Sequence, residues 1–137
     1  MLCVEETLAI DMKNIRITLR DLKINARLNG SATAGKIWDS LPLKSFTSTW
    51  GEEIYFQIPV KAKLEDGFSK ETVEIGDLGY WPEGKCFCIF FGPTPMSKPG
   101  EIRPASQVNV IGKIEGDWEL LKKIKQDEKV YIEELTD

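Results

Sequence analysis

The segment 86–91, with the sequence CFCIFF, constrains the fold more than any other part of the chain. All six residues are apolar, so a strand built from them is hydrophobic on both of its faces. Such strands are typical of the middle of a sheet that is covered on both sides. We therefore expect a central, doubly buried strand at 86–91, with the other elements arranged around it.

Most of the remaining chain consists of short segments in which apolar and polar residues alternate. Residues 14–28 alternate in two halves around Arg20-Asp21, which predicts a β-hairpin. Further strands are predicted at 45–50, 53–58, 71–75, 107–114 and 129–134, with 78–81 as an additional short candidate. Many short strands of this kind favour an all-β fold, and we predict a closed β-barrel of about eight strands.

Two short segments have helical spacing instead. The first has Ser31 or Thr33 as its cap and stops at Pro42, which cannot continue a helix. The second follows a cap at Asp117. Their inward-facing residues are predicted to be Ala34, Ile37, Trp38 and Leu41 in the first helix and Trp118, Leu121 and Ile124 in the second. We expect one helix near each end of the barrel.

The 137 residues are enough for one domain, which we place at 14–137. Residues 1–13 form an N-terminal extension in this interpretation, and either Met12 is the true start or residues 1–11 are frayed. No apolar run approaches the roughly 18 residues of a membrane-spanning helix, and the first residues lack the pattern of a secretory signal. We therefore expect no membrane association.

Composition excludes several classes of function. The chain has no histidine, which removes Ser-His-Asp and Cys-His catalysis, and its three cysteines are too few for a thiolate zinc site. Sparse cysteines favour a reducing compartment, so we expect a cytoplasmic protein. The net charge of −4 argues against nucleic acid as a partner. Phosphate-loop and dinucleotide motifs are missing, so we expect no cofactor and assign no metal site, and whether the carboxylates hold a divalent metal is left open. The oligomeric state is left open.

Three stretches combine aromatic, turn-forming and polar residues at predicted strand ends, where barrels usually present binding residues: 50–56, 76–84 and 91–97. Glu52, Glu53 and Asp77 are candidates for one carboxylate cluster that binds a cation or acts as acid and base. The alternative is that they are ordinary solvated turn residues. Likewise, Trp50 and the Tyr80-Trp81 pair form either a stacking surface or a cover for one barrel end.

The order of elements and four motifs resemble the cyclophilin fold, and in particular a family of small uncharacterised cyclophilin-like proteins of bacteria and archaea. The motifs are WGEEIYF at 50–56, GDLGYWP at 76–82, FGPTP at 91–95 and PASQVNVIG at 104–112, and the resemblance runs from Asn14 to Glu134. True cyclophilins isomerise Xaa-Pro bonds with an arginine in a Phe-His-Arg motif. That motif is missing here, and Arg103 is the one plausible substitute. The resemblance therefore implies a fold more than a prolyl isomerase activity.

The smaller family implies an acidic pocket at one end of the barrel. Carried over by position, that pocket contains Glu53, Tyr55, Asp77, Tyr80, Thr94 and Asn109, with Trp50 and Phe91 as walls. Asn109 fits only with a bulge or a strand end if its neighbouring valines face inward. We expect a binding domain for a small cationic or hydrogen-bond-donating ligand, either a small molecule or a peptide. The alternatives are an enzyme, either a prolyl isomerase or a carboxylate-dependent hydrolase, and a protein-interaction module.

Overall fold

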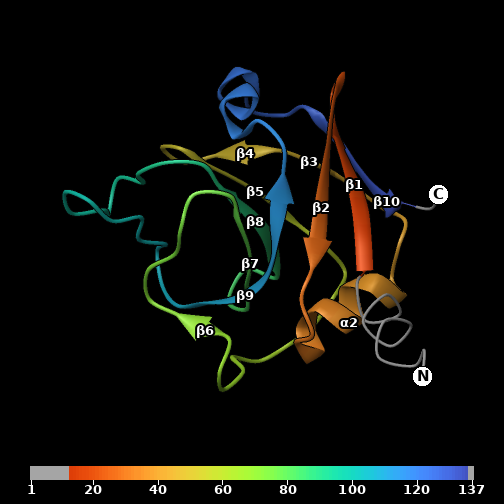
Figure 1. Cartoon of the computed structure of the whole chain (residues 1–137), viewed down its shortest axis with the longest axis horizontal. Coiled ribbons are helices and arrows are strands. Elements are labelled where there is room, and N and C mark those ends of the chain that lie inside the picture. The colour runs from red at the N-terminus through yellow and green to blue at the C-terminus, as the bar shows by residue number, and fades with distance from the viewer. Residues whose placement is uncertain (1–12, 136–137) are drawn as a thin grey trace, which may run out of the picture.

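The computed structural model describes residues 13–135, which form ten β-strands, one α-helix and one 3₁₀ helix (Figure 1). The strands are β1 (Lys13–Leu19), β2 (Leu22–Leu28), β3 (Leu43–Phe46), β4 (Ser48–Thr49), β5 (Glu53–Gln57), β6 (Ser69–Lys70), β7 (Asp77–Trp81), β8 (Cys86–Phe90), β9 (Val108–Glu115) and β10 (Lys129–Glu134). The helices are α2 (Ala32–Asp39) and η1 (Trp118–Lys123). The predicted extension, apart from Lys13, lies outside the described residues, as does Cys3.

All strands belong to one antiparallel sheet in the order β3-β10-β1-β2-β9-β7-β8-β5-β4, with β6 paired to β9. The expectation of an all-β fold is confirmed, but two features differ from it. There are ten strands, because the segment 45–50 is divided into β3 and β4, β6 forms in place of the strand predicted at 71–75, and the additional candidate at 78–81 is the strand β7. The sheet is also not closed: β3 and β4 stand at its two ends and are linked through the chain at Thr47, whose backbone bonds to Asp127 and Glu128. A closed barrel is therefore not confirmed.

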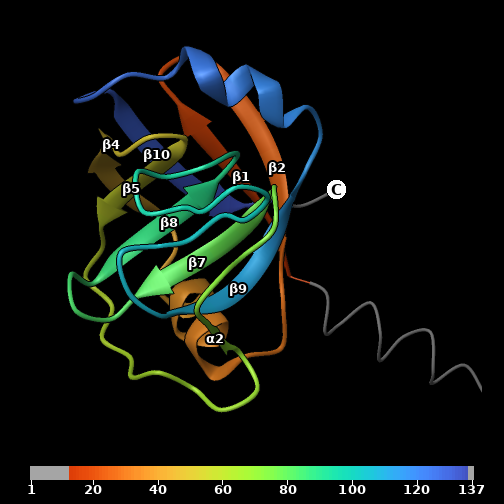
Figure 2. The ribbon, with the colours of Figure 1, turned by 90° about the vertical axis from the view of Figure 1, so that its left-hand side faces the viewer.

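The predicted doubly buried strand is β8, which lies between β7 and β5, and all five of its residues are buried. Phe87 and Ile89 belong to the main core inside the curved sheet. Cys86, Cys88 and Phe90 belong to a second cluster on the outer face. This outer cluster also contains Val73, Ile102 and Val108. The segment 92–107, teal in Figure 2, runs in front of β7 and β8 and covers them on this side. The strand that the sequence marked as apolar on both faces is thus covered on both faces.

The two helices lie at opposite ends of the sheet, α2 at the lower end and η1 at the upper end in both views (Figures 1 and 2). Each begins at a cap that the sequence predicted. The Ser31 side chain accepts a hydrogen bond from the Ala34 backbone, and Asp117 does the same for Glu119. Within residues 13–135, no helix is long and apolar enough to cross a membrane.

Two of the strand predictions were wrong, one in its bounds and one in its existence. The segment 45–50 is divided into β3 and β4, because the backbone of Thr47 bonds outside the ladder. The segment 71–75 forms only an isolated bridge between Val73 and Ile102. Next to it, Ser69 and Lys70 pair with β9 as β6. The alternation around Val73 therefore reflects one buried anchor in the outer cluster rather than a strand.

Candidate functional site

The chain reverses direction between β4 and β5 in a tight turn at residues 50–53. The backbone N–H of Trp50 donates to the Glu53 carbonyl at 2.9 Å, and that of Glu53 donates back to Trp50 at 3.2 Å. Gly51 has a φ of +61°, which glycine adopts without a Cβ penalty. A Cβ at this position would lie 2.9 Å from the Pro93 carbonyl oxygen. The turn therefore needs glycine at position 51, and it packs the stretch 50–56 against the stretch 91–97.

Behind this turn, Glu53 lines a small pocket on the outer face of the sheet. The cavity has a volume of about 130 Å³. The other lining residues are mostly aromatic or apolar: Trp50, Tyr55, Trp81, Cys88, Pro104, Ala105 and Val108. The structure thus brings together Trp50, Glu53 and Tyr55, three of the candidate site residues. Trp81 joins them from β7, and Pro104 and Ala105 join from the segment that covers the sheet.

The Glu53 carboxyl group is buried, with only 6% of the residue exposed. This burial raises the pKa of Glu53 to about 7, although a hydrogen bond with the Cys88 thiol acts in the opposite direction. Among the described residues, no lysine or arginine forms an ion pair with Glu53. A carboxylate in these surroundings lacks the compensation that buried charges normally have. Glu53 is therefore poised to change its charge near neutral pH.

The two cysteines of β8 share one face of the strand. Both are free and buried. Burial, followed by the nearby charge of Glu53, raises the pKa of both thiols, and that of Cys88 lies well above its usual value. Thiols that hold their protons are poor nucleophiles. They serve here as packing in the outer cluster, and the Cys88 thiol donates to the Cys86 carbonyl at 3.8 Å.

Asp77 does not join Glu53 in the pocket, so the predicted carboxylate cluster does not form. Glu53 is paired with Phe90 in the ladder, and Asp77 lies level with Phe90 on the other side of β8. The two acidic residues are therefore at the same end of the sheet, but two strand spacings, or about 10 Å, separate their backbones. The Asp77 carboxylate accepts a hydrogen bond from the Glu74 backbone at 2.8 Å and lies 3.5 Å from the Lys113 ammonium. Asp77 is thus neutralised locally.

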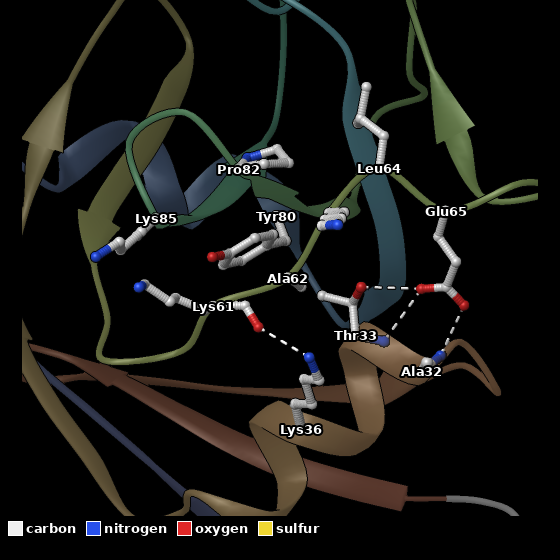
Figure 3. Close-up of a pocket in the computed structure, with 11 residues that line it drawn as sticks. Ala32, Thr33, Lys36, Lys61, Ala62, Leu64, Glu65, Tyr80, Pro82 and Lys85 are labelled. Carbon is white, nitrogen blue, oxygen red and sulfur yellow. Dashed lines mark hydrogen bonds between the residues drawn. The ribbon is translucent and has the colours of Figure 1, made fainter.

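Tyr80 lies at a second cavity, near α2 (Figure 3), and Asn109 is bonded to residues of its wall. Tyr80 lines it, and its hydroxyl donates to the Val60 carbonyl. Asn109 is fully buried, and its amide group bonds to Thr33, Lys63 and Glu65. Asn109 is buried because Val108 and Val110 pack in the outer cluster, so that alternation turns Asn109 to the opposite face. No bulge at Asn109 is needed to place it there.

Phe91 and Thr94 have other surroundings. Phe91 packs in the main core. The Thr94 hydroxyl donates to the Arg103 carbonyl and lies 3.2 Å from the Ser97 hydroxyl, which ties together the two ends of the loop between them. Neither residue lines the Glu53 pocket. Within residues 13–135, no group of three or more cysteine or carboxylate side chains could hold a metal ion.

Comparisons with known proteins agree with this fold. The model of a family described as Cyclophilin-like matches residues 13–133. The chain belongs to the cyclophilin-like family. The solution structure of a hypothetical protein from Archaeoglobus fulgidus is similar to this cyclophilin-like chain, with a TM-score of 0.76 and 38% sequence identity. That match covers 91% of this chain and 96% of the archaeal one. A comparison with curated proteins finds no match.

The family relationship directs attention to Arg103, the predicted substitute for the cyclophilin arginine. Its guanidinium group binds the Glu101 carboxylate at 2.8 Å and lies 3.7 Å from that of Glu71. The hydrogen bond with Glu101 raises the pKa of Arg103 above its usual range. In this cyclophilin-like chain, Arg103 is therefore paired with the carboxylates of Glu101 and Glu71, and it is the neighbour in sequence of Pro104, which lines the Glu53 pocket.

Proposed function

We propose that the chain is a binding domain that takes a small cationic or hydrogen-bond-donating group in the Glu53 pocket. The observation that carries this proposal is the Glu53 carboxyl group itself, which is buried among aromatic walls without a cationic partner in the described part of the chain. A ligand cation would supply that missing partner. Trp50, Tyr55 and Trp81 would add cation–π attraction to it.

The size of the pocket limits what can enter. A volume of about 130 Å³ corresponds to roughly four water molecules in the liquid, at about 30 Å³ each. This is smaller than the roughly 300–1,000 Å³ of pockets that enclose a whole drug-sized ligand. The ligand is therefore a small amine or amide, or one such end group of a larger molecule or peptide.

The free thiols of Cys86 and Cys88 support a place for this domain in a reducing compartment such as the cytoplasm.

The test is a thermal-shift and calorimetric screen of small ammonium compounds against neutral molecules of the same shape. The wild type is compared with Glu53→Gln and with Glu52→Gln as the matched control, since Glu52 is adjacent but faces Lys122 at 3.9 Å. A ligand at about 100 times its Kd adds roughly 2.7 kcal/mol to the free energy of unfolding, a shift that is easily measured. We expect hits that Glu53→Gln abolishes and Glu52→Gln retains.

The affinity should also depend on pH. A cation binds the ionised form of Glu53, so affinity should increase as pH rises through about 7, the pKa of Glu53. Ammonium compounds that bind Glu53→Gln as well as the wild type, or with no change across this pH range, would contradict the proposal.

A second candidate function is general acid–base catalysis by Glu53. The observation in its favour is the pKa of about 7, since proton transfer is most efficient when the pKa of the group lies near the working pH. Asp77 cannot be the second member of the pair, because it binds Lys113 on the far side of β8. Turnover of a bound ligand that is lost in Glu53→Gln while binding persists would favour this candidate over simple binding.

A further inference from the structure

A second and larger cavity lies near the end of the sheet where α2 is found, separate from the Glu53 pocket (Figure 3). Its volume is about 600 Å³, within the usual range for small-molecule sites. It lies between the first turn of α2, the segment 61–65 and the turn between β7 and β8. The lining residues are Ala32, Thr33, Lys36, Lys61, Ala62, Lys63, Leu64, Glu65, Tyr80, Pro82 and Lys85.

This cavity is basic in a chain that is acidic overall. Four lysines line it, Lys36, Lys61, Lys63 and Lys85, while the net charge of the chain is −4. In the part of the chain that the structure describes, none of the four forms an ion pair with a carboxylate. In Figure 3, Lys61 and Lys85 extend on the side to which the Tyr80 hydroxyl points. Their ammonium groups are available to a ligand at that side of the cavity.

Glu65 is the one carboxylate among the lining residues, and it is occupied elsewhere. Its oxygens accept hydrogen bonds from the backbone N–H of Ala32 at 2.8 Å, from that of Thr33 at 3.1 Å and from the Thr33 hydroxyl at 2.9 Å. Glu65 therefore satisfies the free N–H groups at the start of α2, which is where an anion would otherwise bind. The four lysines still exceed this single carboxylate by three positive charges.

The wall of the cavity is fixed by buried polar contacts. The Asn109 side chain donates to the Lys63 carbonyl at 2.8 Å and to the Thr33 hydroxyl at 3.0 Å, and it accepts from the Glu65 backbone at 2.8 Å. These bonds join the segment 61–65 to α2 and β9. A wall that is already ordered loses little conformational freedom on binding.

We propose that this cavity binds a small organic phosphate. A phosphate dianion matches the excess of positive charge, and lysine ammonium groups bind phosphate as compact point charges. Ala62, Leu64 and Pro82 offer apolar contact to the organic part of the ligand. The volume admits a molecule of that size, whereas the Glu53 pocket does not.

The test uses phenyl phosphate as the probe, with inorganic phosphate, benzoate and phenol for comparison. Binding is measured by isothermal titration calorimetry and mapped by amide chemical shifts. The variant Lys61→Met/Lys85→Met removes two charges and keeps the aliphatic stems. The control Lys44→Met/Lys129→Met removes two exposed charges from β3 and β10, elements that do not line this cavity.

We expect saturable binding of phenyl phosphate, with shifts at 32–36 and 61–65, and a loss of about tenfold or more in affinity in the first variant only. Benzoate should bind more weakly, and high salt should weaken the complex because Lys36, Lys61 and Lys63 are exposed and Lys85 is half-buried. Equal weakening in both variants would mean that only net charge matters, and it would overturn the proposal. Shifts elsewhere, equal binding of benzoate, or no saturation would overturn it as well.

Discussion

The clearest consequence of the structure is that removal of one carboxyl group should change how stability depends on pH. The pKa of Glu53 rises from 4.5 in an exposed chain to about 7 in the folded protein. Between these values the folded state holds a proton that the unfolded state has released. The free energy of unfolding therefore decreases as pH rises through this interval. At about 1.4 kcal/mol per pKa unit, the interval from 4.5 to about 7 corresponds to a loss of about 3 kcal/mol.

The substitution Glu53→Gln isolates this effect, because glutamine resembles the protonated acid and does not titrate. Urea unfolding of both proteins should be followed from about pH 4.5 to about pH 8. The wild type should lose about 3 kcal/mol relative to Glu53→Gln over that range, and the variant should be the more stable protein at the upper end.

Other carboxylates do not confuse this comparison. Hydrogen bonds hold the pKa of Glu74 and of Glu101 below the usual value, so the stability they provide is lost only as pH falls below about 4.5, and they are present in both proteins. Parallel stability curves for wild type and Glu53→Gln across the whole range would show that Glu53 is already ionised at low pH, and would refute the reasoning from burial.

Three further substitutions test the architecture around the two cavities, each by urea unfolding. Gly51→Ala should reduce the free energy of unfolding clearly more than Gly67→Ala. An alanine at either position has to adopt a positive φ, which destabilises by about 1–2 kcal/mol, but only at Gly51 would the new Cβ also collide with the Pro93 region. Equal destabilisation by the two substitutions would contradict the close approach at Gly51. Asn109→Ala should destabilise the protein by about 3 kcal/mol, since it leaves buried groups without hydrogen-bond partners, whereas Asn25→Ala should change stability little. Similar effects of the two substitutions would contradict the polar network around Asn109. Glu65→Gln should reduce the free energy of unfolding by about 1 kcal/mol at neutral pH and should have no effect once acid has protonated Glu65 in the wild type. The reason is that, although burial alone would raise the pKa of Glu65, hydrogen bonds from Ala32 and Thr33 to the carboxylate lower it. A destabilisation that persists in acid would rule out the charged cap.

Those features of the fold that depend on neighbours in sequence could be predicted. The hairpin of β1 and β2 has the predicted bounds to within one residue, because a run of alternating residues with a tight connection determines it locally. The caps Ser31 and Asp117 are equally local. The position of β8 followed from its apolar composition. By contrast, β6 is only two residues long and forms because it pairs with β9. Nothing in the residue types at 69–70 predicts that pairing.

The grouping of the candidate site residues could be predicted only in part, for a similar reason. Trp50, Glu53 and Tyr55 lie within one turn and one strand, so the motif that contains them stays together in the structure. Whether Asp77 joins them depends on the ladder on both sides of β8, and on Lys113, which is paired with Asp77 across β7 and β9. Such pairings over long sequence separations are not encoded in the spacing of a motif. The contribution of Trp81 depends on the same register.

Asn109 shows why strand alternation alone does not decide which side chains share a site. Alternation says that Val108 and Val110 lie on one face and Asn109 on the other, but it does not say which face is the interior. In a sheet with apolar clusters on both sides, valine fits either face, and here both valines pack outside. The polar residue between them therefore faces the interior, and it bonds to the segment that forms the basic cavity. Glu53 thus lines its pocket on one face of the sheet, whereas Asn109, on the opposite face, bonds to residues that form the wall of the basic cavity.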